Sequence, residues 1–331
     1  MICRIAVIGG GAWGSALAAS LARNGHEVRL HCRREELAGA LASGICPALE
    51  NAALPGFAAV STDLASILAE AEIILLALPA RASAALIPQL GGMMQPAASL
   101  VLTAKGLVGE QGLLLPEIAA SQLANPAVVL TGPSFADEVL AGVPTAMIAA
   151  SHDAAAAARV AGLFSGSNIR AYPADDPIGA AIGGAMKNVI AIASGMISGL
   201  PADAGLGDNS RAALITRGLA EATRFALALG GRQQTLFGLA GIGDLVLSCS
   251  GVHSRNFAYG LALGQGSRPA AKLAEGRHAV LPILRRAEQH EVNLPISSAV
   301  AAVIHDDVPI SEAIRQLWAR PVMAEWNSVA D

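Results

Sequence analysis

The first half of the chain alternates short apolar runs with stretches of helical spacing. The runs are Ile5–Ile8, Val28–Leu30, Ile73–Leu78, Leu100–Leu102, Val128–Leu130 and Ala146–Ala149. Each run is nearly continuous and not interrupted by polar residues, as in parallel strands that are covered on both faces. The pattern therefore predicts an α/β fold with a doubly wound parallel sheet, whose strands are joined by crossover helices.

The pattern changes near Asp175. From there on, glycine-punctuated and alanine-rich segments show helical spacing, and no convincing strand follows Ala171-Tyr172. A length of 331 residues suits about two domains of ordinary size. We therefore expect a sheet domain over residues 1–175 and an all-helical domain over residues 176–331, with the boundary between Pro173 and Pro177.

Composition and charge exclude several classes of protein. The net charge of −4, without any long run of Lys or Arg, argues against a nucleic-acid partner. The longest strongly apolar stretch, Val189–Leu200, has about 12 residues against the ~20 of a membrane helix, so no membrane insertion is expected. The first apolar run is interrupted after Ile8, which disfavours a secretory signal and predicts a cytoplasmic protein.

The cysteines argue against disulfides and metals. Their positions show no C-x-x-C spacing, which favours reduced thiols and predicts no metal site. They are Cys3, Cys32, Cys46 and Cys249.

A glycine-rich turn follows the first predicted strand. Gly9, Gly11 and Gly14 have G-x-G-x-x-G spacing directly after Ile5–Ile8, and the helical stretch Ser15–Arg23 comes next. In such a unit the first glycine permits the turn, the second lets backbone approach a pyrophosphate, and the third lets helix and strand pack closely. The helix N-terminus favours phosphates. The turn predicts that the sheet domain is a Rossmann-type dinucleotide-binding domain.

The end of the second predicted strand bears on the choice of dinucleotide. An acidic residue there would bind the adenosine ribose, but this chain has Arg33 and Arg34 in its place. Two guanidinium groups suit a 2′-phosphate, which favours NADP(H) and leaves NAD(H) possible. In the alternative interpretation, the two arginines open the next helix from solvent beside Glu35 and Glu36.

Further polar residues occur where the sheet and a helix would meet a substrate. Lys105 and the segment Gly132–Ala136 follow two successive strands, at the sheet edge where α/β proteins bind ligands. Lys187 lies within the apolar helical stretch Ala180–Ile197. Desolvation would lower the pKa of this lysine toward the range useful for proton transfer. The alternative is a lysine that extends to the surface.

Two later motifs add a carboxylate and an anion-binding group. Gly241–Asp244 and Ser254–Asn256 lie within a dozen residues of each other. Either motif alone is also typical of a turn or a helix cap.

The order of these and other blocks resembles the bacterial NAD(P)-dependent glycerol-3-phosphate dehydrogenase family over essentially the whole chain. The blocks are Gly9–Gly14, Asn51 with Leu54–Gly56, Lys105-Gly106, Gly132–Ala136, Lys187–Ala191, Gly207–Asn209, Ala212–Gly218, Gly241–Leu247, Ser254–Asn256 and Glu275-Gly276. The resemblance implies reversible hydride transfer between NAD(P)H and dihydroxyacetone phosphate, which forms sn-glycerol 3-phosphate for phospholipid synthesis.

The resemblance also implies roles for individual residues. Lys187 matches the proton-transferring lysine, and Lys105, Asn188 and Asp244 match the polar network that holds it and the substrate. The substrate contacts that it implies are Lys105, Gly132, Ser134, Lys187, Asp244, Ser254, Asn256 and, on the phosphate, Arg255. The resemblance adds cofactor contacts to the glycine turn and Arg34, which the motifs already indicate. The full set of expected cofactor contacts is Gly9, Gly11, Ala12, Trp13, Gly14, Arg33, Arg34, Lys105, Ala136, Arg255, Leu273 and Glu275.

Two rival functions fit the sequence less well. A β-hydroxyacid dehydrogenase usually spaces its lysine several residues before its asparagine, whereas Lys187 and Asn188 are adjacent. A cofactor-sensing protein without chemistry should have lost Lys187, Lys105 or Asp244, and all three are present. The apolar helical domain also favours a homodimer that covers part of its surface.

Overall fold

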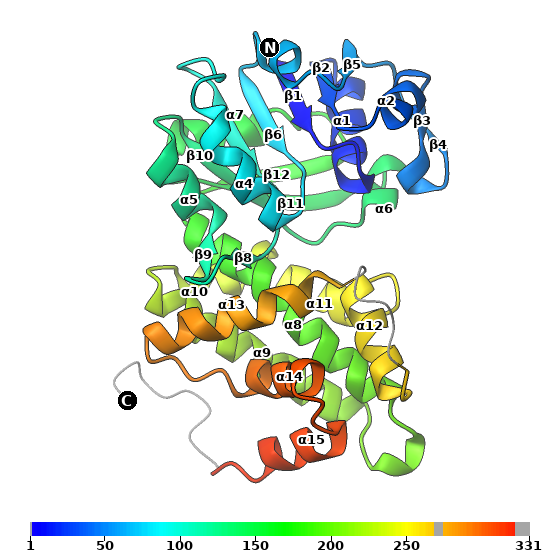
Figure 1. The fold of residues 1–331 in the computed structure, drawn as a ribbon, viewed down its shortest axis with the longest axis vertical. Coiled ribbons are helices and arrows are strands. Elements are labelled where there is room, and N and C mark those ends of the chain that lie inside the picture. Colours follow the sequence, from blue (N-terminus) through cyan, green and yellow to red (C-terminus); the bar gives the residue numbers. More distant parts are fainter. Residues whose placement is uncertain (1, 268–273, 322–331) are drawn as a thin grey trace.

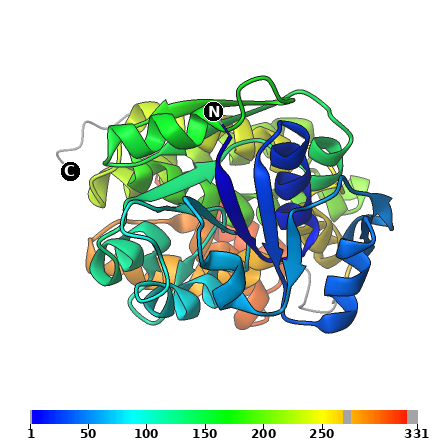
Figure 2. The same cartoon turned by 90° about the horizontal axis from the view of Figure 1, so that it is seen from above.

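The computed structural model describes residues 2–267 and 274–321. A layered α/β domain lies above a helical domain in Figure 1, and the view from above places the orange and red helices behind the blue and cyan strands (Figure 2). The predicted fold class is therefore confirmed. The strands of the large sheet are β1 (Arg4–Ile8), β2 (Glu27–His31), β5 (Ala59–Ser61), β6 (Ile73–Leu76), β7 (Ser99–Leu102), β10 (Ala127–Thr131), β11 (Thr145–Ala150) and β12 (Ile169–Ala174).

The eight strands follow the order β12-β11-β10-β7-β6-β1-β2-β5. Strand β1 pairs in parallel with β2 on one side and with β6 on the other, so the order of the strands reverses at β1. In such a sheet, ligands bind outside the carboxyl ends of the strands at this switch point. The glycine turn directly after β1 therefore lies where a dinucleotide site is expected.

The structure corrects the predicted sheet in two respects. Strand β11 runs antiparallel to β10, whereas all strands were expected to be parallel. A buried strand has the same apolar pattern in either direction, so the pattern did not carry this information. Strands β5 and β12, at the two edges of the sheet, were not among the predicted apolar runs. Strand β5 has only three residues, and most residues of both strands are half-buried or exposed.

Helices cover both faces of the large sheet, and two short hairpins lie beside it. The helices are α1 (Ala12–Arg23), α2 (Glu35–Ala42), α3 (Leu64–Leu68), α4 (Ala80–Leu90), α5 (Leu115–Gln122), α6 (Ala136–Leu140) and α7 (Ala154–Gly162), with the turn η1 (Pro47–Leu49). The hairpins pair β3 (Ile45–Cys46) with β4 (Ala52–Ala53), and β8 (Leu107–Val108) with β9 (Leu113–Leu114). One apolar core fills each face of the sheet.

After Ala174, the described residues form helices, turns and irregular segments. They include α8 (Pro177–Gly199), η2 (Ala202–Ala204), α9 (Asp208–Ala228), α10 (Gln233–Leu236), η3 (Leu239–Gly243), α11 (Asp244–Cys249), α12 (Arg255–Gly264), α13 (Glu275–Gln289), α14 (Pro295–His305) and α15 (Ile310–Trp318). The carboxylate of Glu221 on α9 accepts hydrogen bonds from the first backbone amides of α14, at Ile296 and Ser297. The exact division between residues 175 and 176 stays a prediction.

Helix α8 is the central element of the helical domain. Asp176 caps its start by accepting a hydrogen bond from Gly179 N (2.8 Å). Glycines bring α12 into backbone contact with it, since a Cβ atom at Gly195 would lie 2.1 Å from Phe257 O, and one at Gly260 only 2.0 Å from Ile192 O. The helical domain is thus built around a helix whose neighbours approach at backbone distance.

Helix α8 is also longer than the apolar stretch seen in the sequence. It has 23 residues and is long and apolar enough to cross a membrane, which corrects the expectation that no span in the chain reaches that length. The difference arises because Ala and Gly residues extend the apolar segment toward Pro177. Of the segment of α8 that is apolar enough to span a membrane, 83% is buried inside this fold. The four cysteines are likewise buried and unpaired.

Candidate active site

The turn between β1 and α1 has the geometry that a dinucleotide requires. Gly9 has φ +123°, and a Cβ atom there would lie 2.4 Å from Ala77 O. A Cβ atom at Gly14 would lie 1.9 Å from Gly9 O, whereas at Gly11 it would meet nothing within 4 Å. The first and third glycines are thus needed for the turn itself, while the second leaves open space. These residues fit a bound pyrophosphate at the N-terminus of α1.

The other predicted cofactor residues surround this turn. Ala12 and Trp13 form the half-buried first turn of α1, and Ala136 begins α6. Arg33 and Arg34 are exposed directly after β2, where Arg34 is the N-cap residue of α2. Their guanidinium groups are therefore accessible to a phosphate, although the position also agrees with arginines that open a helix from solvent.

Two lysines from different domains share one buried carboxylate. Lys105 Nζ lies 2.5 Å from Asp244 Oδ2, and Lys187 Nζ lies 2.6 Å from Asp244 Oδ1. The carboxylate is fully buried, while 17% of the Lys105 side chain and 12% of the Lys187 side chain are exposed. A buried carboxylate is tolerated when it is paired and hydrogen-bonded. The arrangement leaves one net positive charge at the edge of the site.

Glycines in α8 allow these groups to approach. A Cβ atom at Gly183 would lie 2.4 Å from Ala240 O, so only glycine lets the turn η3 pack against α8. One at Gly184 would lie 3.2 Å from Lys105 Cγ. Because α11 begins at Asp244 directly after η3, this packing sets the position of the carboxylate.

The environment of Lys187 favours the loss of its proton. Burial, together with the nearby Lys105 ammonium, lowers the pKa of this lysine from 10.5 to about 8, against the attraction of Asp244. Lys187 also donates to Ser248 Oγ (2.8 Å). The prediction of a desolvated lysine with a depressed pKa is confirmed. A group of this kind can both donate and accept a proton near neutral pH.

Ser248 was not among the site residues predicted from the sequence. It lies four residues after Asp244 on α11 and is buried. Residues at i and i+4 share one helix face, so a polar residue four positions after a candidate carboxylate was the available signal.

Two asparagines connect the site to the start of α13. Asn256 Nδ2 donates to Asn188 Oδ1 (2.8 Å), and Asn256 Oδ1 accepts from Gly276 N (3.0 Å). Asn188 Nδ2 in turn lies 3.5 Å from the Lys105 carbonyl oxygen. Both side chains are buried, so they bind mainly other protein groups and hold the surrounding elements in place.

The predicted phosphate-binding residues lie at the N-terminus of α12. Ser254 is the N-cap residue and accepts from Phe257 N (3.4 Å), while Arg255 is exposed in the first turn. Ser134 Oγ donates to Gly132 O (3.1 Å), and the same carbonyl accepts from Lys105 Nζ (3.3 Å). These contacts connect the segment after β10 to the lysine pair.

The last two predicted cofactor residues along the chain are Leu273 and Glu275. Glu275 is the exposed first residue of α13, and Leu273 lies outside the described residues. Within the described part of the chain there is no group of three or more His, Cys, Asp or Glu side chains that could hold a metal ion.

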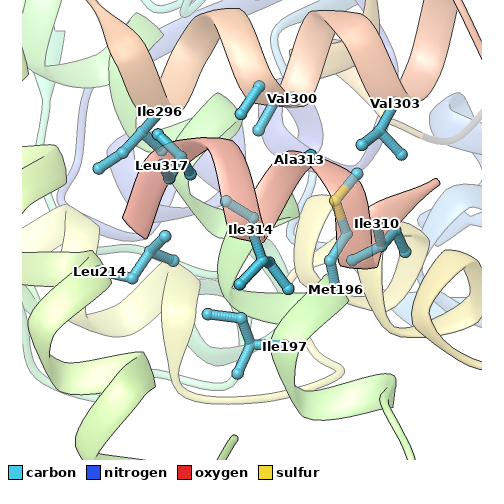
Figure 3. A pocket seen from close by; sticks show the side chains of 12 residues that line it. Met196, Ile197, Leu214, Ile296, Val300, Val303, Ile310, Ala313, Ile314 and Leu317 are labelled. Atoms are coloured by element: carbon cyan, nitrogen blue, oxygen red, sulfur yellow. The ribbon is translucent and has the colours of Figure 1, made fainter. Parts of the chain in front are cut away.

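A cavity of about 40 Å³ elsewhere in the helical domain is purely apolar. Figure 3 shows side chains of α8, α9, α14 and α15 around it, among them Met196, Leu214, Val300 and Ile314. Its lining offers no polar or charged side chain for a reaction. The titratable groups that could transfer a proton lie instead around Asp244.

Comparison with known proteins matches both halves of the chain to one family. The model of the NAD-dependent glycerol-3-phosphate dehydrogenase N-terminus matches residues 4–157, and that of the C-terminus matches residues 176–315. Glycerol-3-phosphate dehydrogenase (NAD(P)+) from Mesorhizobium japonicum is 44% identical over 98% of this chain and 94% of the relative. The Bradyrhizobium sp. protein of the same name is 43% identical over 97% and 98%.

A solved structure gives the same result. The crystal structure of glycerol-3-phosphate dehydrogenase from Coxiella burnetii has a TM-score of 0.88 and 35% sequence identity, and the match covers 96% of this chain and 99% of that chain. The chain therefore belongs to the NAD-dependent glycerol-3-phosphate dehydrogenase family.

Proposed function

We propose that this chain catalyses the reversible reduction of dihydroxyacetone phosphate to sn-glycerol 3-phosphate with NAD(P)H. The observation that carries the proposal is the pair of lysine ammonium groups on the buried Asp244 carboxylate, in a chain of this family with an intact dinucleotide turn. A bound nicotinamide supplies the hydride.

The protein's own part in the reaction is proton transfer and stabilisation of charge. Hydride arrival at the ketone carbon leaves negative charge on the ketone oxygen, and the Lys187 ammonium donates a proton to that oxygen. In the reverse direction the neutral amine accepts the proton. A pKa of about 8 makes both forms accessible near neutral pH. Asp244 holds the two ammonium groups in place, and their net positive charge favours the transition state.

The substrate phosphate is proposed to bind at the N-terminus of α12. The first backbone amides of a helix attract an anion, and the exposed Arg255 adds a guanidinium that pairs well with phosphate. Among the described residues, nothing forms an ion pair with this guanidinium. We propose that Gly132 and Ser134 complete the substrate contacts from the sheet domain.

The adenosine end of the cofactor is proposed to lie against Arg33 and Arg34. Both are exposed at the carboxyl end of β2, and no acidic residue there binds the ribose in their place. This favours NADP(H), with NAD(H) as an alternative cofactor. Trp13, Ala136, Glu275 and Leu273 stay predicted cofactor contacts.

We also propose a cellular setting for the reaction. The product is a precursor of glycerophospholipids, so the enzyme would serve phospholipid synthesis in the cytoplasm. The proposed homodimer is supported by exposed apolar side chains on and beside α11, such as Val246 and Val252. Sedimentation equilibrium of the purified protein tests the dimer directly.

The activity is tested by mixing the purified protein with NADPH and dihydroxyacetone phosphate and following NADPH absorbance. Dihydroxyacetone, which lacks the phosphate, serves as the control substrate. Arg255→Ala should raise the KM for the phosphorylated substrate about 10- to 100-fold, as expected for the loss of hydrogen bonds to a charged group. No oxidation of NADPH by the wild-type protein, or an unchanged KM in the variant, would contradict the proposal.

A further inference from the structure

His253 connects the helical domain to the sheet domain beside the proposed substrate site. Its ring lies against Phe135, with ring centroids 4.5 Å apart and planes tilted by 32°. Its Nε2 lies 2.9 Å from Asp137 Oδ2. One side chain of the α11–α12 connection is thus held by two residues of the sheet domain.

The two segments that this contact joins both belong to the proposed substrate site. His253 directly precedes Ser254, the N-cap residue of α12, where the phosphate is proposed to bind. Phe135 is the N-cap residue of α6, and it follows directly after Ser134. We infer that His253 is a positioning residue that fixes the N-terminus of α12 against residues 132–137 and so sets the affinity for the substrate phosphate.

The sheet-domain segment is a firm support for such a contact. Gly132 has φ +149°, and a Cβ atom there would lie 2.9 Å from Ala146 O, so this backbone is closely packed. Its carbonyl oxygen accepts from Lys105 Nζ. Pro133 also packs against the turn η3, since a Cβ atom at Gly243 would lie 3.6 Å from its ring. Residues 132–137 are therefore held on several sides.

The α11–α12 connection, residues 250–254, has much less support of its own, whereas α12 beyond it is held by Asn256 and by its backbone contact with α8. Val252 is 66% exposed, and the side chain of His253 is 58% exposed. The backbone bond from Ser254 N to Gly251 O (3.1 Å) is local to the turn. The contacts with Phe135 and Asp137 thus tie this short connection to the other domain. Holding it in the binding geometry reduces the ordering that phosphate binding would otherwise require.

The exposure of the pair argues against a purely stabilising role. About half of each side chain is in solvent, and polar contacts between exposed side chains add little to the free energy of unfolding. Their effect is therefore expected in substrate binding, through the position of Arg255, and not in protein stability. The inference rests on the proposed function, because it assumes that a phosphate binds at α12.

The test compares His253→Ala, His253→Phe and Asp137→Ala with the wild-type protein. We expect His253→Ala to raise both the KM for dihydroxyacetone phosphate and the inhibition constant of inorganic phosphate by about 3- to 10-fold, a range typical of contacting residues. The kcat should stay within about twofold, and the KM for NADPH should rise less than the KM for dihydroxyacetone phosphate, because Arg255 is also a predicted cofactor contact. His253→Phe, which keeps an aromatic ring against Phe135, should lose less. The double variant His253→Ala/Asp137→Ala should bind substrate no worse than His253→Ala alone.

Two controls make the outcome specific. His290→Ala changes an exposed histidine at the end of α13. Glu117→Gln removes the charge from a different contact between the domains, the ion pair of Glu117 Oε1 with Arg286 Nη2 (2.9 Å). Both should leave the KM for dihydroxyacetone phosphate unchanged.

The outcomes separate this inference from the function on which it rests. A wild-type protein that does not reduce dihydroxyacetone phosphate overturns the proposed function. An active wild-type protein whose His253→Ala variant keeps its KM and its phosphate inhibition overturns only the role of His253. A rise of equal size in the KM for dihydroxyacetone phosphate in Glu117→Gln, or an equally large rise in the KM for NADPH in His253→Ala, would indicate a general loss of contact between the domains. Either result would also overturn the role of His253.

Discussion

Replacing Lys187 by methionine separates the proposed chemistry from folding. Methionine keeps much of the length and the apolar character of the side chain but removes the ammonium that donates to Asp244 (2.6 Å) and Ser248 (2.8 Å). General acid catalysis typically contributes about 10²- to 10⁴-fold, so kcat for dihydroxyacetone phosphate reduction should fall by that factor. The Kd for NADPH should stay unchanged. Lys187→Arg, which keeps the charge but cannot release its proton, should show a similar fall.

The structure also gives the size of the effect on stability. The pKa of Lys187 falls from 10.5 when unfolded to about 8 when folded, which corresponds to a free-energy difference on the order of 3 kcal/mol. The unfolded chain holds this proton more tightly, so the group destabilises the fold below pH 8. That penalty disappears as the pH rises from about 8 to 10.5. Since the shift already includes the attraction to Asp244, and Lys105 still pairs with that carboxylate, Lys187→Met should fold normally at pH 7.

Two measurements check this reasoning. Steady-state kinetics gives kcat, and urea unfolding at several pH values from 7 to about 10 gives the stability difference between wild type and variant. Relative to Lys187→Met, the wild-type protein should gain stability over that range. A folded variant with near-normal kcat would refute the assignment, and Lys105 would become the leading candidate for the proton donor. A stability difference that does not change with pH would show that the lysine is not desolvated.

Three further predictions concern the cofactor turn, the adenosine end and a buried carboxylate. Replacing Arg33 and Arg34 by alanine should weaken NADPH by about 1.5–3 kcal/mol per lost charged hydrogen bond and NADH far less, which fluorescence titration measures; equal weakening would exclude a 2′-phosphate contact. Gly14→Ala should destabilise the fold because its Cβ atom would meet backbone, whereas Gly11→Ala should fold normally but bind NADPH weakly. Thermal unfolding measures the stability and titration measures NADPH binding; equal losses of stability in the two variants would contradict this prediction. Burial raises the pKa of Glu221 from 4.5 to about 7, so the folded state holds this proton more tightly and stability should fall by about 3 kcal/mol as the pH rises through that window; urea unfolding of Glu221→Gln should lack this fall.

Local patterns in the sequence were enough to predict most of the Rossmann-type domain. The turn from Gly9 to Gly14 needs glycines at fixed offsets, and the buried strands need continuous apolar runs, so neighbouring residues alone carry both signals. The antiparallel direction of β11 and the short edge strand β5 depend on pairing with distant strands. Such pairing leaves no local signal in a run that is apolar in either direction.

The candidate site shows the same division between local and distant information. The apolar setting of Lys187 was visible along the sequence, and it led to the correct direction of its pKa shift. The contact of both lysines with Asp244 was not visible along the sequence, because this carboxylate is 57 residues from Lys187 and 139 residues from Lys105. Only the family resemblance named the three residues together, and only the structure gives the reason. Each of these charges is costly to bury alone, and together they leave a single positive charge beside the proposed substrate site. Loss of Asp244 would therefore leave two ammonium groups in mutual repulsion, so the carboxylate is needed for both lysines to lie at this site.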